Sequence, residues 1–276
     1  MRTETVEPWG WDRALCAKLS RLGINEALLP TDEQLQRFRQ WSHRRTAARL
    51  LPLLQQENVV GEASECFTMD ELSARAKEYD GIVVKAPWSS SGRGVRMLLT
   101  DADVQNAMKW MENVIASQGS IMVEPFYQKV MDLGMEFTAL PSGNIRYDGL
   151  SLFDTHNSAY TGNLVATEST KRNIISRYIP VSLLDNIKQK IKAVMRFEDY
   201  TGPLGVDMMI VANTGNGRWE GQAEHLLHPC VEINLRRTMG HVALSLTPAS
   251  DDELLVMNIS YDGSQYLFNI KEWQQT

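Results

Sequence analysis

Cysteine is scarce in this sequence, and long apolar runs are missing from it. The three cysteines, Cys16, Cys66 and Cys230, are odd in number and far apart, which excludes a disulfide framework and a C-x-x-C metal site. No apolar run approaches the roughly 20 residues that a membrane helix needs. The N-terminal stretch MRTETVEPWGWD holds acidic residues and no apolar core, so it is not a secretory signal. These absences predict a cytoplasmic protein without a membrane partner.

Positive charge is also in short supply. Lysine and arginine together number 28 against 34 aspartates and glutamates, which gives a formal net charge of -6. This balance argues against nucleic acid as a general partner. The apolar fraction of 43% and the charged fraction of 22% are ordinary for a globular protein. A chain of 276 residues is long enough for two or three lobes.

The apolar patterning divides the chain into three expected parts. Residues 1–58 have helical periodicity, residues 59–122 fit the order β-α-β-β-α-β, and residues 123–276 form a larger α+β part. In the first part, the run of His43, Arg44 and Arg45 is interpreted as a solvated helix face. Binding of a substrate anion is the alternative for this run.

Residues 81–99, GIVVKAPWSSSGRGVRMLL, are the stretch around which the chain is organised. They predict a strand that ends at Lys85, a small-residue loop and a second strand. The loop consists of Ser89, Ser90, Ser91, Gly92, Arg93 and Gly94. Such residues let backbone N–H groups close around an anion, beside the charges of Lys85 and Arg93. The loop is not a Walker A motif, because G-x-x-x-x-G-K-[ST] is absent and a strand follows. An ordinary hairpin with a polar turn is the alternative.

Two apolar strands farther along are interrupted by acidic residues. Asp207 lies within residues 205–211, and Glu232 and Asn234 alternate with apolar residues in 230–235, so these two share one face. A lone acid in an apolar strand is costly unless it is paired or bound to metal. Carboxylate and amide oxygens suit Mg²⁺; an ion pair with Arg236 or Arg237 is the alternative. If Asp207 and Glu232 lie opposite each other, residues 213–227 must form a long loop, because the midpoint falls at 219–220.

The segment 122–126, between the second and third parts, holds Pro125. Proline removes a backbone donor and stops strand pairing, which leaves nearby backbone groups free for a ligand. A strand that simply ends at a proline is the alternative.

The order of these features resembles that of the ATP-grasp superfamily, which includes carbamoyl phosphate synthetase, biotin carboxylase and the D-alanine–D-alanine ligases. The resemblance covers about residues 59–245, and its most specific piece is VEINLRR, which is similar to the family's E-x-N-x-R. It implies an α+β fold in which two α+β lobes clasp ATP. The small lobe would carry a glycine-rich lid and the large lobe a metal site. Family members usually begin with a Rossmann-like domain, so this chain is either a fragment or has a reduced first domain.

The resemblance also implies roles for individual residues. Lys85 would hold ATP phosphate, and residues 89–94 would close over the β- and γ-phosphates. The hinge at 122–126 would bind adenine through its backbone. Asp132 would bind the ribose, with Glu136 in reserve, and Arg236 would steady the substrate or intermediate. The remaining residues are hinge positions or metal ligands: Val123, Glu124 and Phe126 at the hinge, and Asp207, Glu232 and Asn234 at the metal.

The activity implied by the resemblance is that of a ligase. ATP with two magnesium ions, which Mn²⁺ could replace, would activate a small-molecule carboxylate as an acyl phosphate, and an amine, thiol or other nucleophile would then displace phosphate. Lys85, Arg93 and the metal ions would neutralise charge on the transferred group. A homodimer is one allowed assembly. A kinase that phosphorylates a small-molecule hydroxyl and a non-catalytic ATP-binding module are the alternatives. Four scattered histidines are interpreted as structural: His156, His225, His228 and His241.

Overall fold

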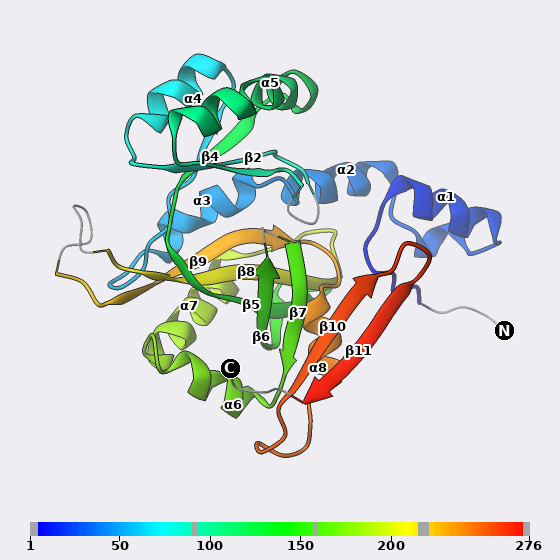
Figure 1. The fold of residues 1–276 in the computed structure, drawn as a ribbon. Helices are drawn as coiled ribbons and strands as arrows, with labels where there is room; N and C mark the ends of the chain where they lie inside the picture. The colour runs from blue at the N-terminus through cyan, green and yellow to red at the C-terminus, as the bar shows by residue number, and fades with distance from the viewer. Residues whose placement is uncertain (1–4, 90–92, 157–158, 215–220, 273–276) are drawn as a thin grey trace.

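The chain forms two antiparallel sheets, one of four strands and one of seven (Figure 1). This architecture is seen in a computed structural model that describes residues 5–89, 93–156, 159–214 and 221–272. In Figure 1 the smaller sheet, with two helices, stands above the larger one. No helix in the described ranges is both long and apolar enough to span a bilayer. The predicted α+β fold is therefore confirmed.

The small lobe consists of a four-stranded sheet with helices on one face. The strands lie in the order β1 (Ser64–Cys66), β4 (Ile121–Pro125), β2 (Ile82–Lys85) and β3 (Val95–Leu98). Helices α4 (Met69–Ala76) and α5 (Asp101–Gln118) pack against Ile82, Val84, Ile121 and Val123. Because side chains alternate along a strand, the residues between these core positions point away from the helices. These residues are Val83, Lys85, Met122 and Glu124, which pair across β2 and β4.

The large lobe is built on the seven-stranded sheet. Its strand order is β11 (Tyr266–Glu272), β10 (Leu255–Tyr261), β7 (Ala159–Val165), β6 (Ile145–His156), β5 (Lys129–Ala139), β8 (Gly202–Ala212) and β9 (His225–Asn234). Helices α6 (Glu168–Ile175) and α7 (Val181–Val194) share a core with Leu133, Leu150 and Val206. Helix α8 (Met239–Ser245) covers the opposite face, where Leu244 lies against Gly149.

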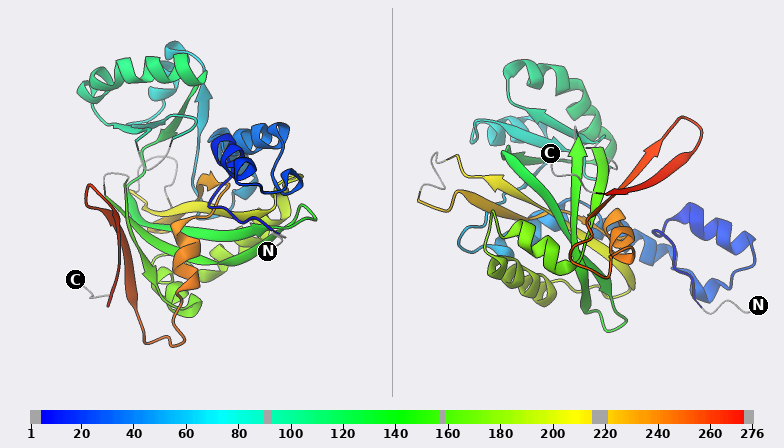
Figure 2. Two further views of the ribbon diagram at one scale, coloured as in Figure 1. Left: turned by 90° about the vertical axis from the view of Figure 1, so that its right-hand side faces the viewer. Right: turned by 60° about the horizontal axis from the view of Figure 1, so that its bottom comes forward.

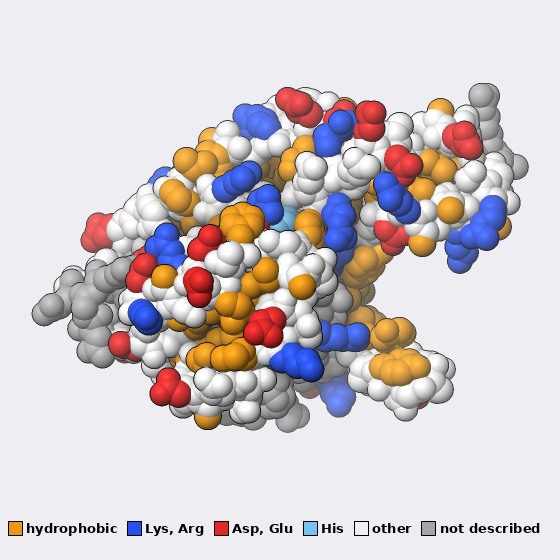
Figure 3. All heavy atoms as spheres, turned by 90° about the horizontal axis from the view of Figure 1, so that it is seen from above, with side chains coloured by type: hydrophobic (Ala, Val, Ile, Leu, Met, Phe, Trp, Pro, Cys, Tyr) orange, Lys and Arg blue, Asp and Glu red, His pale blue; other side chains and the backbone are white. Residues whose placement is uncertain are grey.

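The C-terminal hairpin β10–β11 projects from the large sheet, as both views of Figure 2 show. Its strands pair from Leu255 with Glu272 to Tyr261 with Tyr266. All residues of β11 are exposed. Several of the exposed side chains on this hairpin are large and apolar. Figure 3 shows apolar side chains in orange on the projection at its lower right.

The N-terminal segment is helical, as the periodicity predicted, and it is packed into the large lobe. It contains α1 (Arg13–Arg21), a short 3₁₀ turn (Glu26–Leu28), α2 (Asp32–Trp41) and α3 (Arg45–Leu54). Thr31 and Gln34 form the capping box that starts α2. Apolar side chains of α2 and α3, among them Phe38 and Leu54, belong to the same core as β5, β8 and α7. The division at residues 58 and 122 stays a prediction about domain limits.

Strands β8 and β9 are longer than the sequence indicated, and the connection between them is shorter. The predicted loop of 213–227 is wrong at its C-terminal end, since β9 already begins at His225. Asp207 pairs with Glu232, but Met209 pairs with His228, so the register shifts between them. Such a bulge places extra residues in one strand, here β9. With these extra residues, β9 begins earlier in the sequence than uniform pairing with β8 would allow. Residues 215–220 lie outside the described part.

Two short segments, 59–63 and 126–128, join the small lobe to the rest of the chain. His228 in β9 touches both of them: its ring makes an edge contact with Tyr127 at 5.4 Å between centroids, and it packs on Gly61. A Cβ at Gly61 would lie 2.8 Å from Leu51 and 3.1 Å from the His228 ring, and its φ is +131°. Only glycine fits this position. Burial lowers the pKa of His228 to about 3, so the ring stays neutral there.

Neighbouring leucines at the end of α3 provide a test of this packing. Leu54 is fully buried, whereas Leu53 is 58% exposed. We expect Leu54→Ala to lower the free energy of unfolding by about 2–5 kcal/mol, the range for a buried leucine. Leu53→Ala is expected to change it by less than about 0.5 kcal/mol. Urea unfolding measures both. Equal, small effects would mean that the N-terminal helices do not share the large-lobe core.

Candidate active site

Lys85 and Glu124 form a buried ion pair on the face of the small sheet that is turned away from its helices. Lys85 is the last residue of β2, and its Nζ donates to Oε2 of Glu124 at 2.5 Å. Both side chains are more than nine-tenths buried. Glu124, assigned to the hinge by resemblance, therefore uses its side chain to neutralise Lys85. The structure places this lysine directly before the predicted phosphate loop.

The large sheet places Asp207 and Glu232 opposite each other on β8 and β9, as predicted. Asn234 lies beside them, and its Nδ2 donates to Oδ2 of Asp207 at 2.8 Å. Burial raises the pKa of Asp207 to about 8, and the nearby carboxylates of Glu232 and Glu136 add to the effect. Asp207 is therefore an acid that keeps its proton near neutral pH when no cation faces it.

The charged groups of the two sheets converge around one buried thiol. Burial raises the pKa of Cys230 in β9, and four charged side chains act on it electrostatically: Asp207, Glu124, Lys85 and Glu232. Two of these come from the small lobe and two from the large lobe. The predicted phosphate-binding lysine and the predicted metal ligands thus lie on facing surfaces of the two sheets.

Arg44, interpreted from the sequence as part of a solvated face, is buried among these groups. It lies between α2 and α3 and is only 6% exposed. Its Nη2 donates to Oε2 of Glu232 at 3.0 Å, and its Nη1 donates to the carbonyl of Ala86 at 2.6 Å and to Oγ of Ser89 at 2.8 Å. The alternative of an ion pair between Glu232 and Arg236 is therefore wrong: Glu232 pairs with Arg44, and Arg236 donates to Oδ1 of Asn234 at 2.8 Å.

His43 and Arg45 also depart from the solvated-face interpretation. His43 is 3% exposed, and burial with the neighbouring Arg45 lowers its pKa to about 4. Arg45 donates to Oε1 of Glu65 in β1 at 2.6 Å. No sequence signal marked this burial, because charged residues at helical spacing give the same pattern on an exposed face.

The predicted phosphate loop is described only at its two ends. Ser89 accepts the bond from Arg44, and the carbonyl of Gly94 accepts from the amide of Ala86 at 2.8 Å. A Cβ at Gly94 would lie 2.3 Å from that of Ser89, so the turn requires glycine at this position. Arg93 is exposed. Ser90, Ser91 and Gly92 lie outside the described residues.

The hinge segment borders a cavity of about 470 Å³ between the lobes. Pro125, Phe126, Tyr127 and Gln128 line it together with residues 78–81 of the small lobe and residues of β8 and β9. The amide of Phe126 donates to the carbonyl of Gly81 at 2.8 Å, so this donor is already used. Val123 pairs with strands on both sides. The hinge backbone is therefore less open to a ligand than its proline suggested.

Asp132 and Glu136, the two candidates for the ribose, lie in different surroundings. Asp132, near the start of β5, accepts from Nζ of Lys129 at 2.5 Å and from Oγ1 of Thr155 at 2.6 Å. Glu136 is 2% exposed, and its Oε2 lies 3.0 Å from Nδ1 of His241. A Cβ at Gly240 would overlap Oε1 of Glu136. Glu136 is thus enclosed by α8, and only Asp132 stands where a ligand can reach it.

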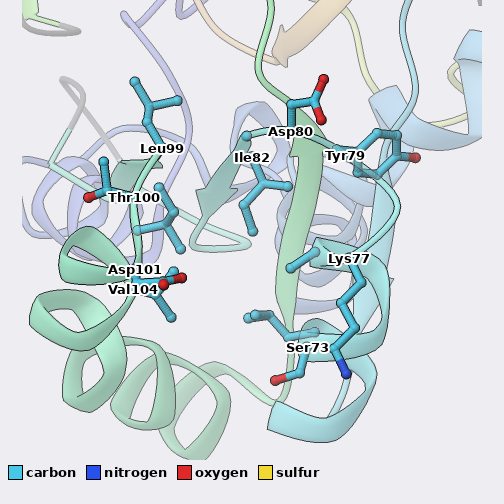
Figure 4. Close-up of a pocket in the computed structure, with 13 residues that line it drawn as sticks. Ser73, Lys77, Tyr79, Asp80, Ile82, Leu99, Thr100, Asp101 and Val104 are labelled. Carbon is cyan, nitrogen blue, oxygen red and sulfur yellow. The ribbon is translucent and has the colours of Figure 1, made fainter. Parts of the chain in front are cut away.

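A second cavity, of about 570 Å³, lies within the small lobe (Figure 4). Figure 4 shows Ser73 of α4 and Lys77, which follows that helix, on one side, and Thr100 and Asp101 at the start of α5 on the other. None of the predicted site residues lines it. The convergence of charges lies elsewhere, between the sheets.

The residues between the sheets include oxygen donors of the kind that bind a hard metal ion. Within the described ranges, no group of three or more His, Cys, Asp or Glu side chains is arranged to hold one. Asp207 and Glu232 provide two carboxylates, and Asn234 provides an amide. Mg²⁺ commonly binds one or two carboxylates and completes its shell with water and phosphate oxygens. The donor set fits such an ion and does not fit zinc.

The sequence matches no protein-family model and no curated protein. Its structure resembles that of a biotin carboxylase from Campylobacter jejuni in complex with β,γ-ATP, with a TM-score of 0.56 and 13% identity over 90% of this chain and 56% of that one. It also resembles the biotin carboxylase domain of a 2-oxoglutarate carboxylase from Hydrogenobacter thermophilus, a dimer in complex with MgADP, ADP and bicarbonate. For that structure the TM-score is 0.55, with 12% identity over 89% of this chain and 60% of that one.

A third solved structure is an N5-carboxyaminoimidazole synthase from Aspergillus clavatus, in complex with ADP and 5-aminoimidazole ribonucleotide. The TM-score is 0.52, with 12% identity over 91% of this chain and 63% of that one. The chain therefore spans between 56% and 63% of the length of these three proteins. All three are ATP-grasp enzymes. The chain has the ATP-grasp fold.

Proposed function

We propose that this protein binds ATP with magnesium between its two sheets and uses it to join a small-molecule carboxylate to an amine or thiol. The observation that carries the proposal is that Arg44 contacts both Ala86, which follows Lys85 of the small sheet, and Glu232, which pairs with Asp207 in the large sheet. A cation on one wall and two carboxylates on the other suit a polyphosphate that is bound together with a metal ion. The three structural neighbours are named as a biotin carboxylase, the biotin carboxylase domain of a 2-oxoglutarate carboxylase and an N5-carboxyaminoimidazole synthase, each with bound nucleotide, which supports this class.

The chain's own residues would divide the work of binding. Lys85 would turn from Glu124 toward a phosphate oxygen, and the amides of residues 89–94 would close around the outer phosphates. Asp132 would accept from the ribose hydroxyls, and the hinge at 122–126 would contact adenine. Asp207, Glu232 and Asn234 would hold magnesium, for which two ions are expected. Magnesium would neutralise charge on the transferred phosphoryl group.

The proposed chemistry has two steps that balance without a redox partner. A carboxylate oxygen of the substrate attacks the γ-phosphorus, and the bond to the β-phosphate oxygen breaks, which gives an acyl phosphate and ADP. The nucleophile then attacks the acyl carbon, and inorganic phosphate leaves with the electron pair of the C–O bond and takes up the proton that the amine or thiol loses. Arg93 and Arg236 would stabilise negative charge in these steps, so catalysis would consist mainly of positioning and electrostatics.

Calorimetry tests the central claim. We expect ATP to bind tightly with Mg²⁺ and much more weakly in EDTA, because without the metal nothing bridges the phosphates to Asp207 and Glu232, and the charge of Glu232 repels them. Equal affinity in both conditions would rule out the metal assignment. A screen of carboxylates with amines and thiols for phosphate release then tests for ligation. A phosphorylated hydroxyl product without a coupled product would indicate a kinase instead.

The buried pair of Lys85 and Glu124 allows binding to be separated from stability. We expect Lys85→Met to lower the free energy of unfolding by about 3–5 kcal/mol, because Glu124 is left buried without its partner. Adding Glu124→Gln removes that charge and should restore most of the stability. ATP affinity of the double variant should stay weaker by about 1.5–3 kcal/mol, the value of a hydrogen bond to a charged group. Normal ATP binding by the stable double variant would make Lys85 structural only.

The raised pKa of Asp207 predicts how stability depends on pH. An unfolded aspartate loses its proton near pH 3.9, whereas Asp207 keeps it in the folded chain up to about pH 8. Between these values the folded state binds more protons, so the free energy of unfolding contributed by Asp207 falls as pH rises. We expect Asp207→Asn to be more stable than the natural chain, by an amount that grows from about pH 5 to about pH 8 and reaches on the order of a few kcal/mol.

Urea unfolding across this pH range, without nucleotide or metal, measures the effect. Asp252→Asn is the matched control, since Asp252 is exposed; its curve should run parallel to that of the natural chain. A constant difference between Asp207→Asn and the natural chain at all pH values would contradict the assignment of a proton to Asp207.

A further inference from the structure

Arg44 links the two halves of the proposed nucleotide site through one side chain. It lies outside the stretch of about residues 59–245 that resembles the ATP-grasp family. Its guanidinium contacts Glu232 on the large sheet and Ala86 and Ser89 at the start of the phosphate loop. Glu232 is 188 positions away in the sequence. One side chain from the N-terminal helices thus joins a proposed metal ligand to the proposed phosphate loop.

The backbone around Arg44 is fixed on both sides. The amide of Arg44 donates to the carbonyl of Pro87 at 3.2 Å, and Nε1 of Trp88 donates to the carbonyl of Arg39 at 2.8 Å. Trp88 also makes an edge contact with His43 at 4.5 Å. On the other side, α3 packs into the large-lobe core through Leu50, Leu51 and Leu54. The guanidinium is therefore held from both lobes and does not depend on Glu232 for its position.

We propose that Arg44 is a positioning residue of the nucleotide site, which orients Glu232 toward the metal. The inference rests on the proposed function. Arg44 donates a hydrogen bond to Oε2 of Glu232, which leaves Oε1 to bind a cation. The carboxylate side chain is 28% exposed, so it is accessible from the space between the sheets. Groups that hydrogen-bond a metal-ligating carboxylate fix its orientation in this way.

Only arginine suits this position. One nitrogen of its planar guanidinium donates to a carboxylate, and the other donates to both a hydroxyl and a carbonyl. The guanidinium also keeps its charge at any pH. Lysine would present one nitrogen and could not span both lobes. The charge on Arg44 also offsets that of Glu232, so the two acidic strands β8 and β9 can pair before a metal arrives.

Calorimetric titration of ATP, with Mg²⁺ and in EDTA, tests the inference on the full chain. We expect Arg44→Met to weaken binding of ATP by about 10–100-fold with Mg²⁺, the usual effect of losing such a contact, and by less than about 3-fold in EDTA. Arg44→Lys should fall between Arg44→Met and the natural chain. Arg45→Met is the matched control: it removes the neighbouring link to Glu65 and should leave both affinities unchanged.

The double variant Arg44→Met with Glu232→Gln completes the cycle. If Arg44 acts through Glu232, the double variant should bind ATP with Mg²⁺ no more weakly than Glu232→Gln alone, because the two effects do not add. Melting of each variant shows whether it is folded, and Arg44→Lys serves for comparison where Arg44→Met is not.

Three results would overturn the inference while the proposed function stands. One is an equal loss of ATP affinity with and without Mg²⁺, which would make Arg44 a structural residue. Another is tighter binding with Mg²⁺ in Arg44→Met, which would make Arg44 a competitor of the metal. The third is full additivity in the double variant. If the natural chain itself fails to bind ATP with Mg²⁺, the proposed function and the inference both fail.

Discussion

Compensation of buried carboxylates is the constraint on which the arrangement between the two sheets depends. Four acidic side chains lie in this region, and isolated carboxylates buried there would destabilise the fold. Each is compensated by a different neighbour or by a proton. Glu124 pairs with Lys85 and Glu232 with Arg44, Glu136 lies 3.0 Å from Nδ1 of His241, and Asp207 has Asn234 and its own proton. Because Asp207 holds a proton in place of an ion pair, it is the group that an arriving metal ion would affect most.

The local parts of this arrangement could be predicted from the sequence, because they depend on alternation along single strands. Asp207, Glu232 and Asn234 interrupt apolar strands at a period of two, and the structure pairs Asp207 with Glu232. Lys85 ends a strand, and a small-residue turn follows it. The α+β fold with two lobes followed from the same patterns and from the resemblance that they carry. What alternation cannot supply is the register shift between Asp207 and Met209, so the predicted loop of 213–227 ends too late, although it begins at the right residue.

The partners of the charged residues could not be predicted, because they come from packing between distant segments. The alternative to a metal site paired Glu232 with Arg236, its neighbour in sequence, but Arg44 reaches Glu232 from between α2 and α3. A run of basic residues at helical spacing gives no sign of whether its face is solvated or covered. The covering face is the start of the proposed phosphate loop, where Nε1 of Trp88 donates to the carbonyl of Arg39 and the carbonyl of Pro87 accepts from the amide of Arg44. Only the tertiary structure brings these segments together.

The same contacts restrict how far the small lobe can move. Its two connections, 59–63 and 126–128, are short and both touch His228. A rotation about these connections would have to separate Arg44 from Pro87 or from Glu232, since the N-terminal helices are fixed in the large-lobe core. Separation of Arg44 from Glu232 would leave Glu232 of β9 beside Asp207 of β8 without its cation. The N-terminal helices therefore favour the arrangement in which Lys85 faces the carboxylates, and a polyphosphate with its metal ion would strengthen that same arrangement.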